Sequence, residues 1–109
     1  MKKILTILII ALVSISPIFA QNNSTKKADK LFDRLEFVKA AEEYLKLADK
    51  SPDNYIIGKL ADSYYNIFNT REAEKWYSKI INDDPNAEVV FRYSEMLKAN
   101  GKYKESNVW

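Results

Sequence analysis

The residues of this chain that could take part in chemistry are almost all acids and bases. None of the 109 residues is histidine or cysteine, and only two are glycine. The usual ligands of transition metals are therefore missing, as are the usual general base, the thiol nucleophile and a glycine-rich phosphate loop. We expect no enzymatic activity, no cofactor, no metal site and no small-molecule substrate. What remains is recognition through charge, hydrogen bonds and aromatic surface.

Charged residues recur in two evenly spaced columns. The basic column is Lys26, Lys59 and Arg92, and the acidic column is Asp29, Asp62 and Glu95, so that the numbering advances by 33 each time. One interpretation is a groove in which a basic ladder runs beside an acidic one and holds a polar or extended peptide. The other is a set of ion pairs three residues apart within each helix, which contribute about 0.2–0.5 kcal/mol each on a solvated face. The second interpretation is the commoner fate of charge on a helix surface.

Aromatic and amide side chains fall near the same columns. Phe32, Tyr65 and Asn66 could anchor a partner helix or peptide, although aromatics at helical spacing more often belong to the core. The neighbouring acids Asp83 and Asp84 are met by no second acidic set, so we assign them no catalytic role. The candidate protein-binding residues are Lys26, Asp29, Lys59, Asp62, Tyr65, Asn66, Arg92 and Glu95.

The same constant step governs the elements that must position these side chains. Small residues recur at Ala40, Ala73 and Ser106, and tyrosine recurs at 44 and 77. A fixed period of about 20–50 residues is typical of stacked units, none of which can bury its apolar face alone. The period therefore predicts a stack that presents a surface to a partner.

The turn signals divide the chain into six helices. Pro52 and Pro85 disfavour helix continuation, Asn69 can cap a helix, and Gly101 can accept a positive φ at a helix end. No sustained alternation of period two suggests strands. We predict helices near 25–35, 37–50, 54–68, 71–83, 87–99 and 102–109. Short connections favour antiparallel neighbours, so the unit is helix–turn–helix in an all-α chain.

The second unit resembles a tetratricopeptide repeat. It reads Leu60-Ala61-x-x-Tyr64 on its first helix and Ala73, Tyr77, Ile80 and Pro85 on its second helix and closing turn. The resemblance implies a right-handed α-solenoid of about two and a half units, over residues 21–53, 54–86 and 87–109, with the first helices on the concave face. Small residues such as Ala61 and Ala73 would let paired helices approach closely, so a bulky side chain there would overpack the core.

Residues 1–20 are expected to be a signal peptide. Lys2 and Lys3 precede an apolar run from Ile4 to Ile15, and Ala20 offers a small residue at a cleavage site. A retained membrane anchor is the alternative, although the run is short for a span. A flexible leader is expected over 21–27. Of the 17 basic residues two lie in the signal, so the rest balance the 15 acids, which argues against a nucleic-acid partner.

A closer resemblance is carried by the runs KLFDRLEFVKAAEEYLKL, KLADSYYNIFNTREAEKWYSKII and RYSEMLKANGKYKESN, which follow a signal ending in FAQ. They resemble the N-terminal region of exported OmpA-family proteins of gliding, type IX-secreting bacteria. The resemblance implies an exported, periplasmic and outer-membrane-associated scaffold whose partners are envelope or secretion-system proteins. Peptidoglycan would be bound only by a C-terminal domain that this sequence does not contain.

Two organisations follow from that resemblance. The third unit stops at Trp109 within its second helix, which leads us to expect the front part of a longer protein. The alternative is a freestanding periplasmic adaptor or chaperone.

Overall fold

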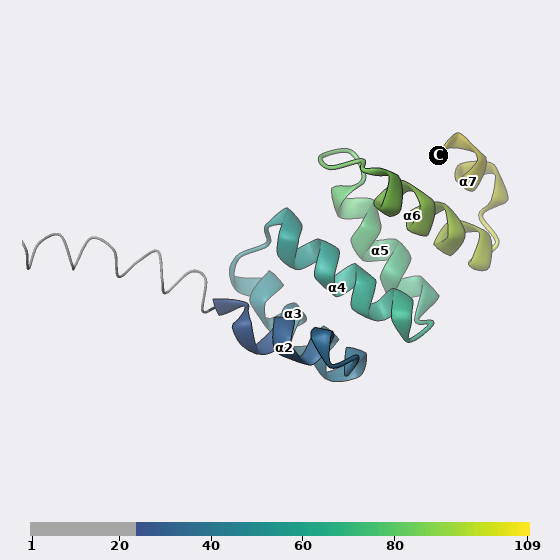
Figure 1. Ribbon diagram of the computed structural model, residues 1–109. Coiled ribbons are helices and arrows are strands. Elements are labelled where there is room, and N and C mark those ends of the chain that lie inside the picture. Colours follow the sequence, from purple (N-terminus) through teal and green to yellow (C-terminus); the bar gives the residue numbers. More distant parts are fainter. Residues whose placement is uncertain (1–23) are drawn as a thin grey trace, which may run out of the picture.

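The computed structural model describes residues 24–109, and within this range the regular structure is entirely helical (Figure 1). The six helices are α2 (Lys26–Asp33), α3 (Phe37–Lys50), α4 (Asn54–Asn66), α5 (Thr70–Ile80), α6 (Ala87–Ala99) and α7 (Tyr103–Val108). Each packs chiefly against the next helix in the chain, and α4 also contacts α6. The expectation of an all-helical chain is therefore confirmed over the described residues.

The observed helix ends fall within a few residues of the predicted ones, and the differences have local causes. Helix α4 ends at Asn66, short of the predicted 68, because Phe68 has a positive φ of 58°. Helix α5 ends at Ile80, and residues 81–83 form a turn before Pro85. Helix α2 begins at Lys26, so the predicted leader over 21–27 is wrong for its last two residues.

Three helix starts are capped by short polar side chains. The carboxylate of Asp53 accepts a hydrogen bond from the backbone N–H of Ile56, and Asn86 does the same for Val89. Asn69 accepts more weakly, at 3.3 Å, from the N–H of Glu72. These bonds satisfy backbone donors that a helix leaves free at its start. Asn69 therefore has the capping role predicted from the sequence.

The turns between α2 and α3, α4 and α5, and α6 and α7 share one backbone conformation. Leu35, Phe68 and Gly101 have φ values of 63°, 58° and 80°, and they follow one another at the same constant step as the charged columns. Glycine holds this left-handed conformation without steric cost, whereas leucine and phenylalanine do not. In Figure 1 these three turns lie along one edge of the stack.

The core consists of two clusters along the stack. One is built around Tyr44 and Leu60 and the other around Tyr77 and Ile80, all of which are buried. Trp76 packs against both clusters and joins them. The small residues expected at close helix contacts are buried at Ala28, Ala40, Ala61, Ala73 and Ser106, whereas Ser94, at the equivalent position of the third unit, is only half-buried.

The predicted signal peptide over residues 1–20, and residues 21–23 of the predicted leader, lie outside the described residues. Within the described range, every helix is too short or too polar to cross a bilayer.

Candidate functional site

A carboxylate and a tyrosine join the two helices of each of the first two helix pairs. The hydroxyl of Tyr44 on α3 donates to Asp29 on α2. The hydroxyl of Tyr77 on α5 donates to Asp62 on α4 at 2.5 Å. Both tyrosine side chains are buried. Asp29 and Asp62 therefore each accept a hydrogen bond from a hydroxyl that is shielded from water. Such bonds are short and strong because the acceptor is ionised.

A second aromatic ring packs against each of these tyrosines, and a cation from the next helix pair lies over that ring. Phe32 packs edge-on against Tyr44 with 6.4 Å between ring centroids, and Tyr65 packs against Tyr77 at 6.5 Å. The ammonium of Lys59 lies 4.1 Å from the centroid of the Phe32 ring. A cation above a ring face is attracted by the ring's quadrupole.

Arg92 repeats the role of Lys59 one step along the chain. Its guanidinium lies 5.0 Å from the Tyr65 ring centroid. The basic column therefore binds the preceding helix pair. The contact set of carboxylate, tyrosine, second aromatic and cation occurs twice, and every member of the second set follows its counterpart by the same constant step. We call this set the recurring contact.

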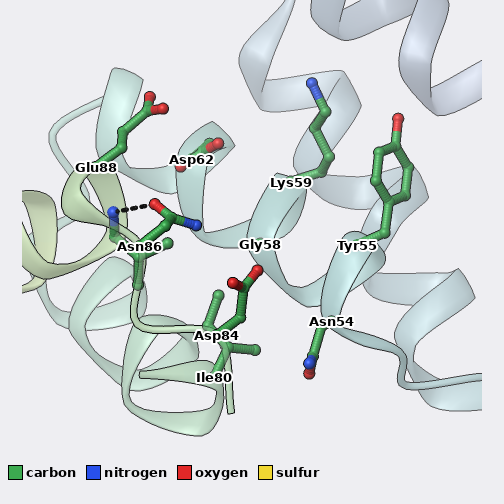
Figure 2. A pocket seen from close by; sticks show the side chains of 10 residues that line it. Asn54, Tyr55, Gly58, Lys59, Asp62, Ile80, Asp84, Asn86 and Glu88 are labelled. Atoms are coloured by element: carbon green, nitrogen blue, oxygen red, sulfur yellow. Dashed lines mark hydrogen bonds between the residues drawn. The ribbon is translucent and has the colours of Figure 1, made fainter. Parts of the chain in front are cut away.

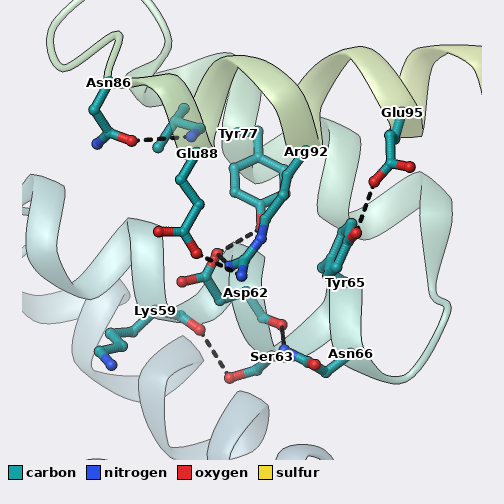
Figure 3. A network of polar contacts seen from close by, with 11 residues as sticks. Lys59, Asp62, Ser63, Tyr65, Asn66, Tyr77, Asn86, Glu88, Arg92 and Glu95 are labelled. Atoms are coloured by element: carbon teal, nitrogen blue, oxygen red, sulfur yellow. Dashed lines mark hydrogen bonds and ion pairs between the residues drawn. The ribbon is translucent and has the colours of Figure 1, made fainter.

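Arg92 also belongs to a polar network that joins three helices (Figure 3). It bonds Asp62 on α4 at 2.8 Å and Glu88 on α6 at 2.5 Å, while Asp62 accepts from Tyr77 on α5. The predicted ion pairs three residues apart within each helix are therefore wrong for the Asp62 and Arg92 positions. The helix faces bring Arg92 nearer to the acid of the preceding pair and to Glu88 one turn back on its own helix than to Glu95.

Glu95 is occupied by a different partner. Its carboxylate accepts a hydrogen bond from the Tyr65 hydroxyl at 2.7 Å, again between α4 and α6 (Figure 3). The side-chain amide of Asn66 donates to the backbone carbonyl of Asp62 within α4. Six of the eight predicted residues thus make contacts from one helix to another, and these are Asp29, Lys59, Asp62, Tyr65, Arg92 and Glu95. Asn66 bonds only within its own helix, and Lys26 is exposed on α2.

The electrostatics of the recurring contact keep its tyrosines protonated. Burial, followed by the hydrogen bond and charge of Asp29, raises the pKa of Tyr44 far above its ordinary value. Burial and the charge of Asp62 do the same to the pKa of Tyr77. Tyr55 lies outside the recurring contact but also donates to Asp29, and burial together with this bond raises its pKa to about 12. These hydroxyls are fixed hydrogen-bond donors at neutral pH.

A hollow of about 180 Å³ lies beside this network, between α4 and the start of α6 (Figure 2). Asp62, Asp84 and Glu88 contribute carboxylates to it, and Gly58 forms part of its wall. Neither Asp83 nor Asp84 forms an ion pair with a described residue. The carboxylates in its lining suit the binding of polar or basic groups.

Three contributors to this face were missed by the sequence reasoning. Tyr55 donates to Asp29 at 2.8 Å and is 51% exposed. Phe91 is 59% exposed and lies one helical turn from both Glu88 and Glu95 on α6. Glu88 completes the ion pairs of Arg92. Its position four residues before Arg92 was a usable signal. Tyr55 and Phe91 had no such signal, because nothing in the spacing distinguishes a groove aromatic from a core one.

Comparison with models of protein families, with curated proteins and with solved structures gives no match for this chain.

Proposed function

We propose that this chain is a non-catalytic protein–protein interaction module of the tetratricopeptide type. In this proposal α2 to α7 form about two and a half units of a right-handed solenoid, and α2, α4 and α6 line its concave face. The observation that supports it best is the recurring contact, which uses the same four kinds of side chain at the same constant step.

The recurring contact makes the face rigid before any partner arrives. Asp62 accepts from two donors, and Arg92 is held by two carboxylates and one ring. A preordered surface loses less conformational entropy on binding. The groups left over for a partner are the exposed rings of Tyr55 and Phe91 and the carboxylate of Asp84, while the Tyr55 hydroxyl is held by Asp29. This pattern suits an extended segment with apolar and basic side chains.

The hydrogen bonds of the acidic column also support a binding role over a catalytic one. Catalytic carboxylates need an environment that separates their pKa values and a reacting atom between them. Here Asp29 and Asp62 are each occupied by tyrosine hydroxyls, and Glu95 is occupied by Tyr65.

For its cellular setting we propose an exported, periplasmic and outer-membrane-associated protein, as the N-terminal helical region of an OmpA-type envelope scaffold. The basis is the sequence resemblance and the signal-like start given above. A freestanding periplasmic adaptor or chaperone is the second candidate, favoured by the continuous packing of α2 to α7 in this chain. Partners in either case would be envelope or secretion-system proteins.

Site-specific photocrosslinking tests the binding role. A benzoylphenylalanine is placed at Tyr55, at Phe91 or, as the matched control, at exposed Ser78 on α5, and the chain is irradiated in the producing cells. We expect one and the same protein adduct from positions 55 and 91 and none from position 78. Equal adducts from all three positions, or none from 55 and 91, would refute a binding face on α4 and α6.

Export is tested separately. Cell fractionation should place the chain in the envelope, and mass spectrometry should find a mature N-terminus at Gln21. Recovery of an uncleaved chain in the cytoplasm would exclude the proposed location without touching the binding role.

A further inference from the structure

The edge that carries the three left-handed turns exposes an apolar side chain at two of them, Leu35 and Phe68, which we call the tips. We call residues 34–39, 67–71 and 98–102 the turn edge. Phe68 is 86% exposed and Leu35 is 72% exposed, the two highest values among the large hydrophobic residues of the first two helix pairs. Val38 on the same edge is also exposed. These side chains therefore contribute little to the core.

Leu35 and Phe68 also occupy backbone positions that suit glycine. Their φ values of 63° and 58° lie in the region that bulky L-residues rarely adopt. The equivalent third position is Gly101, with a φ of 80°. A side chain that strains the backbone and stays in water does not serve the fold of the isolated chain, so its use lies in contact with something else.

Positive charge surrounds the two tips. The turn edge contains five basic residues and one acid. Lys39 pairs with Glu36, and Lys102 pairs with Glu74 on α5. Arg34, Arg71 and Lys98 are exposed and form no ion pair with any described residue. The edge thus combines apolar tips with cations whose charge no neighbour neutralises.

We propose that the turn edge docks on an anionic lipid surface, with Leu35 and Phe68 entering the boundary of the hydrocarbon and Arg34, Arg71 and Lys98 contacting the headgroups. The tips lie on turns that share one backbone conformation along one edge of the stack, so they can meet a plane together (Figure 1). Apolar side chains flanked by basic ones are the composition that binds such membranes.

A lipid surface fits these observations better than an acidic protein. The apolar groups protrude from turns and are 72% and 86% exposed, so a protein partner would need two matching holes, whereas fluid hydrocarbon needs none. The hollows beside the tips, of about 290 and 380 Å³, are lined in part by Glu36 and Glu95, whose carboxylates would repel the side chains of an acidic protein segment. This docking is independent of the proposed function, because the turn edge is separate from Tyr55 and Phe91.

The test uses a fluorescent label to determine which face of the chain contacts the bilayer. The apolar run within residues 1–20 can attach the whole chain to any vesicle, so the amount bound is not the readout. Since the chain has no cysteine, a single cysteine at Val38 can carry a polarity-sensitive fluorophore, and a cysteine at exposed Ser78 provides the matched control. The full chain is mixed with vesicles of phosphatidylcholine alone or of phosphatidylcholine and phosphatidylglycerol at 3:1.

With the anionic vesicles, we expect the label at position 38 to shift to the blue and the label at 78 to stay unchanged. With phosphatidylcholine alone, or at high salt, the shift at 38 should be lost. In the Leu35→Gly and Phe68→Gly double variant, about a hundredfold more anionic lipid should be needed for the same shift, because each of the two apolar insertions is worth about a factor of ten or more. Both glycines suit the local φ, so weaker docking would not arise from unfolding.

Three results would overturn the proposal: equal shifts at positions 38 and 78, the same shift on neutral vesicles, or an unchanged lipid requirement in the double variant. The Phe91→Ala variant, which removes an exposed aromatic from the other face, should keep the full shift at position 38. A loss in that variant would also contradict docking through the turn edge.

Discussion

Leu35 and Phe68 adopt the left-handed conformation that Gly101 adopts at the equivalent position of the third helix pair. Because both side chains are largely exposed, replacing them removes strain and little buried surface. We expect Leu35→Gly and Phe68→Gly each to raise the free energy of unfolding by about 1 kcal/mol. Urea denaturation followed by circular dichroism measures the change.

The Gly101→Ala variant introduces at the third turn the strain that the two glycine variants remove from the first two. A Cβ at Gly101 would meet no heavy atom within 4 Å, so any loss comes from the backbone alone. We expect this variant to lower the free energy of unfolding by about 1 kcal/mol. If the glycine variants at 35 and 68 lost stability while Gly101→Ala changed nothing, the strain assigned to these turns would be wrong.

Tyr44 and Tyr77 make stability depend on pH in the alkaline range. Burial and the neighbouring carboxylates raise the pKa of both tyrosines above the ordinary value in the folded chain. Between that value and the raised one, the folded state holds more protons than the unfolded state, so stability is complete below about pH 10 and falls as the pH rises. Each tyrosine contributes a slope of about 1.4 kcal/mol per pH unit.

The Tyr77→Phe variant should therefore show a shallower alkaline loss. At neutral pH it should be less stable than the parent chain by about 1 kcal/mol, since one hydrogen bond is lost and Asp62 keeps Arg92. Urea unfolding at intervals from pH 8 to pH 11 gives both quantities. The exposed Tyr103→Phe variant controls for general alkaline effects, and identical slopes in the two variants would contradict this account of Tyr77.

At the scale of the helices, the start of α3 is less well capped than the start of α5. Glu36 and Asn69 occupy equivalent N-cap positions, yet the structure records a side-chain cap bond for Asn69 and none for Glu36. Glu36→Asn should raise the free energy of unfolding by about 0.5–1 kcal/mol, and Asn69→Ala should lower it by a similar amount. Thermal unfolding of both variants tests the pair, and the idea fails if Glu36→Asn is the less stable protein.

How far the helices could be predicted from the sequence differs from element to element. Ala40 and Ala73 identified the close helix contacts, and Asn69 and Gly101 identified helix ends, because each residue type has a strong local preference. The left-handed turns at Leu35 and Phe68 were not predicted, since these residue types disfavour that conformation, although the spacing of 33 residues from Leu35 to Phe68 and from Phe68 to Gly101 was a usable signal.

The charged residues of the candidate face could be predicted from the sequence, but their contacts could not. The charged columns were visible in the sequence as a fixed period, but their partners were not. Lys59 and Arg92 contact rings on the preceding helix pair, and Asp29 contacts a tyrosine on the following helix. Such pairings depend on how neighbouring helices are shifted and rotated relative to one another. The spacing of residues within one helix carries no information on that.

For the whole molecule, we expect Trp76 to couple the unfolding of the two core clusters. It packs against both core clusters, together with Tyr64. The parent chain should unfold in a single transition in which far-ultraviolet circular dichroism and tryptophan fluorescence coincide. Trp76→Ala should cost about 2–4 kcal/mol and broaden or split that transition, because neighbouring units stabilise one another mainly through their interface. Retention of one sharp transition would place the coupling elsewhere.

The central claim is that the face of α4 and α6 binds a protein, and the most direct measurement is a map of where that protein binds. The partner captured at positions 55 and 91 is titrated into isotope-labelled chain, and amide chemical shifts are followed by nuclear magnetic resonance. We predict that the largest changes fall on Tyr55, Lys59, Phe91 and Arg92, with little change on α5 around Ser78. Changes centred on α5, or on the turn edge at Leu35 and Phe68, would contradict the claim.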